Sequence, residues 1–179
     1  MIFDIRKHIN DGWGGIDKKI EGIVVALNAL KIPTTGSCEG HINRDAPAPW
    51  IKITSQNEPK NIKTESIASQ QRRKENSRIR KKVLKLLNRF YKDRRVSFDL
   101  RLRITDANVG FWIHNGGKFY DQWRKEINVR AKNIEREIST ENILSAKEKL
   151  ERKKKLPLYQ KEIQKFTNFL ENQTRIGKQ

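Results

Sequence analysis

Two adjacent runs of alternating apolar and polar residues constrain the fold more than any other feature of this sequence. In RVSFDLRLRI, residues 95–104, the apolar positions alternate with polar ones: Val96, Phe98, Leu100, Leu102 and Ile104. The run VGFWIH follows the turn-type sequence TDAN. Side chains of a strand point alternately to the two faces of a sheet, so this pair predicts an antiparallel hairpin with one apolar face.

A loop at residues 105–108 would fix the register of this hairpin. Counting back from that loop places Arg101 opposite Trp112 and Asp99 opposite His114. On the polar face we therefore expect a cation–π contact between Arg101 and Trp112. Asp99 would favour the charged form of His114.

Two further stretches have the spacing of amphipathic helices, because apolar residues recur every three or four positions in residues 16–31 and 79–90. The first helix should end near Lys31, since Pro33 disfavours helical geometry in the residue before it. The stretch PWIKIT predicts a short strand. The second helix is expected over about residues 65–93, with its cations opposite its apolar face: Lys74, Arg78, Lys81, Lys85, Arg89 and Lys92.

The C-terminal third of the chain is predicted to be helical throughout. A long helix is expected to run to residue 138, and Ser139 and Thr140 are plausible caps of a further helix, ENILSAKEKLERKKK. Pro157 is expected to interrupt this helix, and LYQKEIQKFTNFLENQ predicts a last short one.

These elements together predict an α+β fold. The expected architecture is a small mixed or antiparallel sheet backed by helices, with a helical C-terminal arm. We place the core domain, including the long basic helix, at residues 1–138 and the arm at residues 139–179.

The chain is strongly basic, and its charge is concentrated in the predicted helices. The net charge of the 179 residues is +18. Residues 60–95 hold fourteen Lys and Arg against three acidic residues, and residues 118–179 hold sixteen against nine, whereas residues 1–59 are neutral. A polyanion is the natural partner of such a surface, and nucleic acid is the commonest one. A lysine-rich, solvated helix surface without a partner remains the alternative.

The remaining composition bears on the compartment. A single cysteine cannot form an internal disulfide and is consistent with a reducing cytoplasm. No apolar run is long enough to span a membrane, and the first residues lack the apolar segment of a signal peptide. We therefore expect a cytoplasmic protein that does not engage membranes.

The stretch TTGSCEGH, residues 34–41, is the part of the chain with the most chemistry. Ser37 and Cys38 are possible nucleophiles, and Glu39 and His41 can move protons. One cysteine and one nearby histidine are too few ligands for a closed zinc site, so we expect no metal. A glycine-bounded turn with a packed cysteine explains the same residues.

The segment from Gly15 to Ile42 resembles the wyosine-pathway tRNA methyltransferase family. The matching positions are Asp17, Leu27, Asn28, Thr34, Thr35, Ser37, Cys38, Gly40 and Ile42. His41 stands where that family has an arginine, and Gly36 and Glu39 replace serines. The loop is also similar to that of uncharacterised phage and bacterial proteins with a Ser-Cys-x-Gly-His loop. The family resemblance implies that Asp17 and Ser37 line a site in which His41 acts as a titratable group.

Three functions fit these features. The first is a basic nucleic-acid-binding protein, RNA favoured over DNA, with the Ser-Cys-Glu-Gly-His loop as a ligand or phosphate site. The second is a nucleic-acid-modifying enzyme related to tRNA methyltransferases, and the third is a helical assembly protein of a nucleic-acid-containing particle. A protein partner could dock on the C-terminal helices, and the sequence identifies no cofactor.

The candidate residues divide into two groups. Those for catalysis are Asp17, Ser37, Glu39 and His41. Those for nucleic-acid contact are Lys74, Arg78, Lys81, Lys85, Arg89, Lys92, Arg101 and Trp112.

Overall fold

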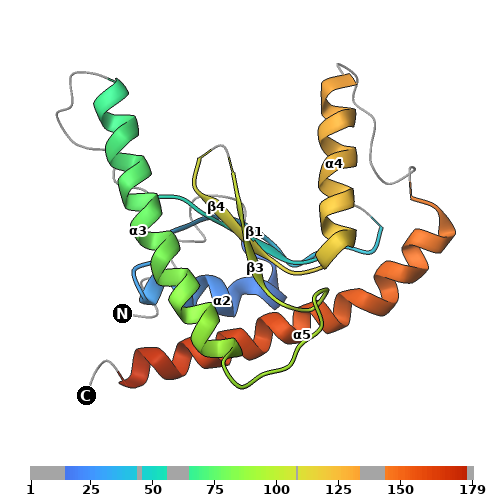
Figure 1. Cartoon of the computed structure of the whole chain (residues 1–179). Helices are drawn as coiled ribbons and strands as arrows, with labels where there is room; N and C mark the ends of the chain where they lie inside the picture. The colour runs from blue at the N-terminus through green and yellow to red at the C-terminus, as the bar shows by residue number, and fades with distance from the viewer. Residues whose placement is uncertain (1–14, 44–45, 56–64, 108, 134–143, 177–179) are drawn as a thin grey trace.

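A computed structural model of the chain describes residues 15–43, 46–55, 65–107, 109–133 and 144–176. These residues form a four-stranded sheet and four helices in the order α2–β1–β2–α3–β3–β4–α4–α5 (Figure 1). The α+β class expected from the sequence is therefore confirmed. None of the described helices is long and apolar enough to cross a membrane.

The strands form one antiparallel sheet in the spatial order β1–β2–β4–β3. They are β1 (Thr34–Cys38), β2 (Trp50–Ile53), β3 (Arg103–Asp106) and β4 (Phe111–His114). β2 is the strand expected from PWIKIT. β1 covers a stretch that we expected to be a loop, and it forms an edge of the sheet.

Four helices surround this sheet. They are α2 (Lys18–Ala29), α3 (Glu65–Tyr91), α4 (Gly117–Asn133) and α5 (Ala146–Ile176). α2 packs along α5 below the sheet in the view of Figure 1. The N-terminal half of α3 and the whole of α4 extend upward from it, on either side of the strands (Figure 1).

The main core lies between one face of the sheet and helices α2, α3 and α5. Ile51 and Ile53 of β2, with Phe111 and Ile113 of β4, point to this face and are fully buried. The helices fill the space with residues at helical spacing: Ile20, Ile23 and Leu27, then Ile79, Val83, Leu86, Leu87 and Phe90, then Ile163, Phe166 and Leu170. The apolar stripes expected in the first two helices are thus the faces that the fold buries.

The β3–β4 hairpin forms, but its expected register is wrong. Ile104 pairs with Ile113 rather than with Val109. The pairing differs from the expected one by four residues, an even number, so the apolar side chains of the two strands still share a face. His114 consequently pairs with Arg103, and not with Asp99.

The register differs because the first strand begins eight residues later than its alternating pattern. The amides of Leu100 and Arg101 donate to the carbonyl of Ser97, which makes a helical turn there. The amide of Leu102 donates to the Tyr91 hydroxyl at 2.8 Å. Phe98, expected on the apolar face, is 58% exposed. Local hydrogen bonds therefore replace the strand pairing that the alternation predicted.

The C-terminal helix also differs from expectation. Pro157 lies inside α5 and does not divide it into two helices. A proline in a helix leaves the carbonyl four residues earlier without its N–H donor. Here both Pro157 and Lys153 are exposed, so water can satisfy that carbonyl. The helix therefore continues, and the residues of its second half complete the main core.

The start of α5 is set by Ser145, which the sequence did not single out as a cap. Ser145 and Glu148 form a reciprocal cap: the Glu148 amide donates to the Ser145 hydroxyl, and the Ser145 amide donates to the Glu148 carboxylate. The expected caps Ser139 and Thr140 lie outside the described residues, as does the expected domain boundary between residues 138 and 139.

Candidate functional site

A stripe of exposed cations runs along α3, on the side opposite its buried face. Lys74, Arg78, Lys81, Lys85 and Arg89 are all exposed. Their spacing of three or four residues keeps them on one side of the helix, over about 22 Å of its length. Lys92, also exposed, follows the end of the helix. Arg78 forms an ion pair with Glu75 at 3.4 Å, which lies at the surface and is weak.

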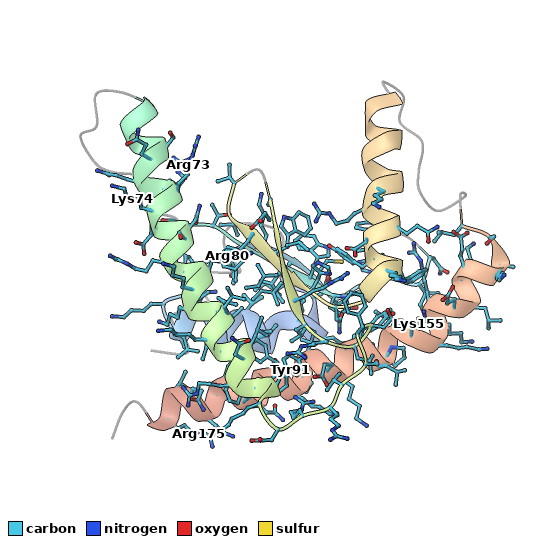
Figure 2. All side chains as sticks on the ribbon, viewed as in Figure 1. Arg73, Lys74, Arg80, Tyr91, Lys155 and Arg175 are labelled. Atoms are coloured by element: carbon cyan, nitrogen blue, oxygen red, sulfur yellow. The ribbon has the colours of Figure 1, made fainter. Side chains whose placement is uncertain are left out.

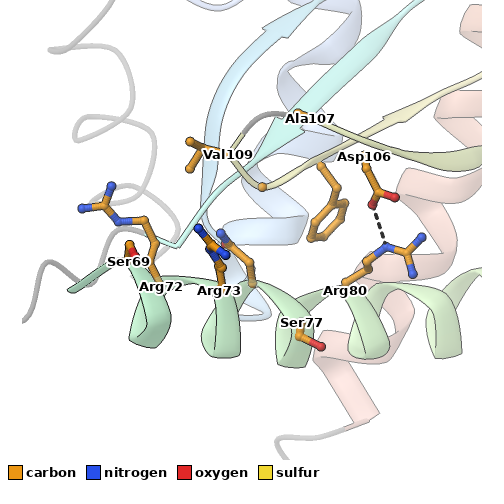
Figure 3. A pocket seen from close by; sticks show the side chains of 11 residues that line it. Ser69, Arg72, Arg73, Ser77, Arg80, Asp106, Ala107 and Val109 are labelled. Atoms are coloured by element: carbon orange, nitrogen blue, oxygen red, sulfur yellow. Dashed lines mark ion pairs between the residues drawn. The ribbon is translucent and has the colours of Figure 1, made fainter. Parts of the chain in front are cut away.

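A pocket of about 400 Å³ lies between the N-terminal half of α3 and the turn of the β3–β4 hairpin (Figure 3). The helix contributes three arginines to it, Arg72, Arg73 and Arg80, together with polar side chains of Ser69, Asn76 and Ser77. The hairpin contributes residues 106–107 and 109–111. Arg80 is bound by Asp106 at 3.3 Å (Figure 3).

The shape of this pocket depends on a glycine in the hairpin turn. Gly110 has a φ of +79°, and a Cβ atom at this position would clash with the carbonyl oxygen of Ile53 in β2. Only glycine lets the turn pass this close to the neighbouring strand. The turn is closed by the amide of Ala107, which donates to the carbonyl of Gly110 at 3.3 Å.

The face of the sheet opposite the main core carries aromatic and basic side chains. Trp50 and Trp112 lie on it with ring centroids 4.6 Å apart, and both are half-buried. Lys52 pairs with Trp112 across the strands, and the guanidinium of Arg124 in α4 lies 5.3 Å from the Trp112 ring. Flat aromatic rings can stack on bases, and cations beside them can contact phosphates.

The expected contact between Arg101 and Trp112 is wrong, because the register is different. Arg101 precedes β3, and its guanidinium lies 4.7 Å from the ring of Tyr91 at the end of α3. Arg124 is the cation that reaches Trp112. Arg101 is exposed and remains a candidate for phosphate contact, but on a different surface from Trp112.

One end of this sheet face is closed by α4. His114 is completely buried and stacks on Tyr120, with ring centroids 3.9 Å apart. Burial, with the nearby guanidinium of Arg103, lowers the pKa of His114 to about 4, although the hydrogen bond to the Asn115 carbonyl acts in the opposite direction. His114 is therefore neutral at neutral pH, and the expectation that Asp99 favours its charged form is wrong. Asp99 instead lies 3.7 Å from the Lys155 ammonium group.

The loop after β1 returns to the start of α2. The Glu39 amide donates to the Asp17 carboxylate at 3.1 Å, and the Lys19 amide donates to the Glu39 carboxylate at 3.2 Å. Gln160 of α5 holds the loop from the other side, donating to the Glu39 carbonyl at 3.0 Å. The carboxylate of Glu39 thus occupies the N-terminus of α2, where free N–H groups and the helix dipole favour an anion.

Two of the three residues expected to share a pocket do so. The ligand atoms of Asp17, Cys38 and His41 lie within 4.8 Å of one another. Ser37 does not belong to this group, because it pairs with Ile51 and therefore faces the main core side of β1. Cys38 pairs with Trp50 and faces the opposite side.

Some functional candidates could not be ranked from the sequence. The basic run of α3 includes Arg72, Arg73 and Arg80 as well as the predicted stripe. These three arginines differ from the stripe because the β3–β4 hairpin lies against their side of the helix and forms a pocket there. The sequence is compatible with Cys38 as a nucleophile or as a packed residue. Its proximity to Asp17 depends on the return of the chain to the start of α2.

No protein family model, curated protein or solved structure matches this chain. The resemblance to the tRNA methyltransferases therefore stays a prediction. Among its matching positions, Asn28 and Thr34 hydrogen-bond to each other at 2.8 Å, between the end of α2 and the start of β1. This bond gives these two positions a structural role, independent of any reaction.

Proposed function

We propose that this protein binds nucleic acid, with RNA favoured over DNA. The observation that carries the proposal is the cation stripe of α3, from Lys74 to Arg89. Its members point to solvent along one side of a helix whose other side is fixed in the main core. A rigid row of cations can neutralise successive phosphates without ordering the helix on binding.

The surroundings of α3 support the same proposal. Arg73 and Lys74 project from the N-terminal half of the helix, and Arg80 lies further along on the side of the sheet (Figure 2). The pocket between this helix and the hairpin is large enough for a small ligand and is lined by arginines, which suit phosphate oxygens.

The preference for RNA rests on the two tryptophans of the open sheet face. Proteins that recognise RNA by its sequence mostly bind single-stranded segments, whose unstacked bases pack on aromatic side chains. Trp50 and Trp112 offer such rings beside Lys52 and Arg124. Comparison of one single-stranded sequence as RNA and as DNA tests this preference directly. Equal affinity would contradict it.

The salt dependence of binding tests the role of the stripe. The logarithm of affinity should fall linearly with the logarithm of salt concentration, with a slope of about −0.7 to −0.9 per phosphate neutralised. Lys81→Gln with Lys85→Gln removes two contacts and should make that slope shallower by about 1.4 to 1.8.

The matched control changes two exposed lysines of α5, Lys153→Gln with Lys161→Gln. Both double variants lower the net charge equally, but only the first alters the α3 stripe. Equal slopes for the two variants would show that net charge, and not the stripe, determines binding. Absence of any binding at low salt would refute the proposed function.

A nucleic-acid-modifying enzyme is the second candidate. The convergence of Asp17, Cys38 and His41 favours it, since residues of these types can perform acid–base or nucleophilic chemistry. Titration with a methyl donor tests the reaction that the family resemblance implies. Binding of nucleic acid without binding of the donor would leave the first candidate and remove the methyltransferase.

A further inference from the structure

We propose that Asp17, Cys38 and His41 form a binding site for a single divalent transition-metal ion, of which zinc fits best. The three residues come from two segments of the chain. Asp17 directly precedes α2, Cys38 ends β1, and His41 lies three residues further along. The fold brings one oxygen, one sulfur and one nitrogen ligand atom within 4.8 Å of one another.

The spacing suits tetrahedral coordination after a small contraction. Zinc bonds to oxygen and nitrogen are about 2.0–2.2 Å long and bonds to sulfur about 2.3 Å, which places tetrahedral ligand atoms about 3.3–3.8 Å apart. Because the ligand atoms all lie within 4.8 Å of one another, no separation in the cluster exceeds this range by more than about 1 Å. Asp17 is exposed and His41 is half-buried, so rotation of their side chains can supply that movement.

Backbone amides of the same loop hold two of the ligand atoms in place. The Gly40 amide donates to the Cys38 sulfur at 3.4 Å, and the Glu39 amide donates to the Asp17 carboxylate at 3.1 Å. Hydrogen bonds of this kind orient ligands. The conformation needs glycine, because Gly40 has a φ of +80° and a Cβ atom there would lie 2.7 Å from Leu156.

The geometry favours a metal over a nucleophile activated by a relay. In a Cys–His–Asp relay, the imidazole lies between the sulfur and the carboxylate, which are then separated by the ring and two hydrogen bonds, roughly 7 Å in all. Here the sulfur and the carboxylate oxygen are themselves within 4.8 Å. All three atoms surround one point.

The ligand set selects the metal class. A thiolate and an imidazole suit zinc and its neighbours in the transition series, whereas magnesium and calcium prefer oxygen ligands alone. Three protein ligands leave a fourth position for water or a substrate oxygen, as in catalytic zinc sites. The site lies on different elements from the cation stripe, so its failure leaves the proposed nucleic-acid binding intact.

Cobalt binding tests the site, because a cobalt–thiolate bond produces a charge-transfer absorption band that cobalt in solution lacks. The full chain is purified, treated with chelator and titrated with Co²⁺, and Zn²⁺ is then added. We expect one equivalent of cobalt to bind with this band, and zinc to displace it. Zinc should also protect Cys38 from alkylation.

Variants assign the ligands. Cys38→Ser should abolish the thiolate band, and His41→Gln or Asp17→Asn should weaken zinc binding by more than about 100-fold, because even partners that only orient a ligand cost about 10- to 100-fold. Asp93→Asn, which alters an exposed carboxylate after α3, is the control and should bind zinc as the parent chain does. Because His41 is half-buried, its variant keeps the test meaningful if Cys38→Ser fails to fold.

Two results would overturn the proposal. One is an absent thiolate band at stoichiometric cobalt. The other is zinc affinity unchanged in His41→Gln and Asp17→Asn. Rapid alkylation of Cys38 that zinc does not slow, and that His41→Gln abolishes, would instead identify a nucleophilic cysteine.

Discussion

Acidification should destabilise this protein because His114 is buried in its neutral form. The His114 Nδ1 hydrogen donates to the Asn115 carbonyl at 3.1 Å, since a carbonyl oxygen can only accept. Nε2 then accepts from the Thr105 hydroxyl, also at 3.1 Å. The Arg124 guanidinium donates to that hydroxyl from the other side. A second ring proton, on Nε2, would therefore point at the Thr105 hydroxyl, which already accepts a hydrogen bond from Arg124. Water cannot solvate the resulting charge, because His114 is not exposed.

The size of the effect follows from the two pKa values of this histidine. Its pKa is about 4 in the folded protein and near the ordinary 6.5 in the unfolded chain. Below pH 6.5 the unfolded state therefore binds more protons than the folded state. The contribution to stability is complete above pH 6.5 and is lost as the pH falls toward 4. Between pH 8 and pH 5 it amounts to about 2 kcal/mol.

Urea unfolding at pH 8 and pH 5 measures this loss. His114→Gln is the comparison, because glutamine keeps a donor and an acceptor but does not titrate. The parent chain should lose about 2 kcal/mol more than the variant between the two pH values. The difference between the two chains separates His114 from carboxylates that titrate in both. An equal loss in both chains would refute a neutral, buried His114.

Other substitutions test the packing and the sheet face. Glu162→Ala removes the buried carboxylate that binds Arg94 at 2.9 and 3.0 Å, and should cost about 3 kcal/mol in urea unfolding; a loss below about 0.5 kcal/mol would contradict the pairing. Ser145→Ala removes the cap of α5 and should cost about 1 kcal/mol by the same measurement. Gly110→Ala should lower the melting temperature and also weaken nucleic-acid binding, because it displaces the turn that borders the arginine pocket. Trp112→Ala should weaken single-stranded RNA binding by about 1–3 kcal/mol if one base stacks there, and unchanged affinity would remove the sheet face from the interface.

The spacing of apolar residues predicted which faces this fold buries. A helix that packs on any surface needs apolar residues every three or four positions, whichever element it packs against. The apolar stripes expected over residues 16–31 and 79–90 are the faces that now form the core. Register was harder to predict, since a strand of the same alternation can slide by two or four residues and still bury its apolar side. The contacts of Leu102 with Tyr91, and the turn at Gly110, determine the actual choice. Both depend on chain segments that the local pattern does not include.

The loop site shows the same limit for chemistry. A sequence motif reports ligands that are near in the chain, such as Cys38 and His41, and two ligands are too few for a stable zinc site. The third is supplied by the residue before α2, which approaches only because β1 runs back along that helix and Glu39 caps it. Asp17 thus lies at the start of a helix that the apolar spacing predicted. The other two ligands, Cys38 and His41, are brought to it by the pairing of β1, which the spacing did not predict. Loss of the Glu39 cap should therefore separate the metal ligands without removing any of them. Glu39→Ala, which removes the carboxylate that accepts from the Lys19 amide, tests whether the fold of this loop, and not its composition, makes the site.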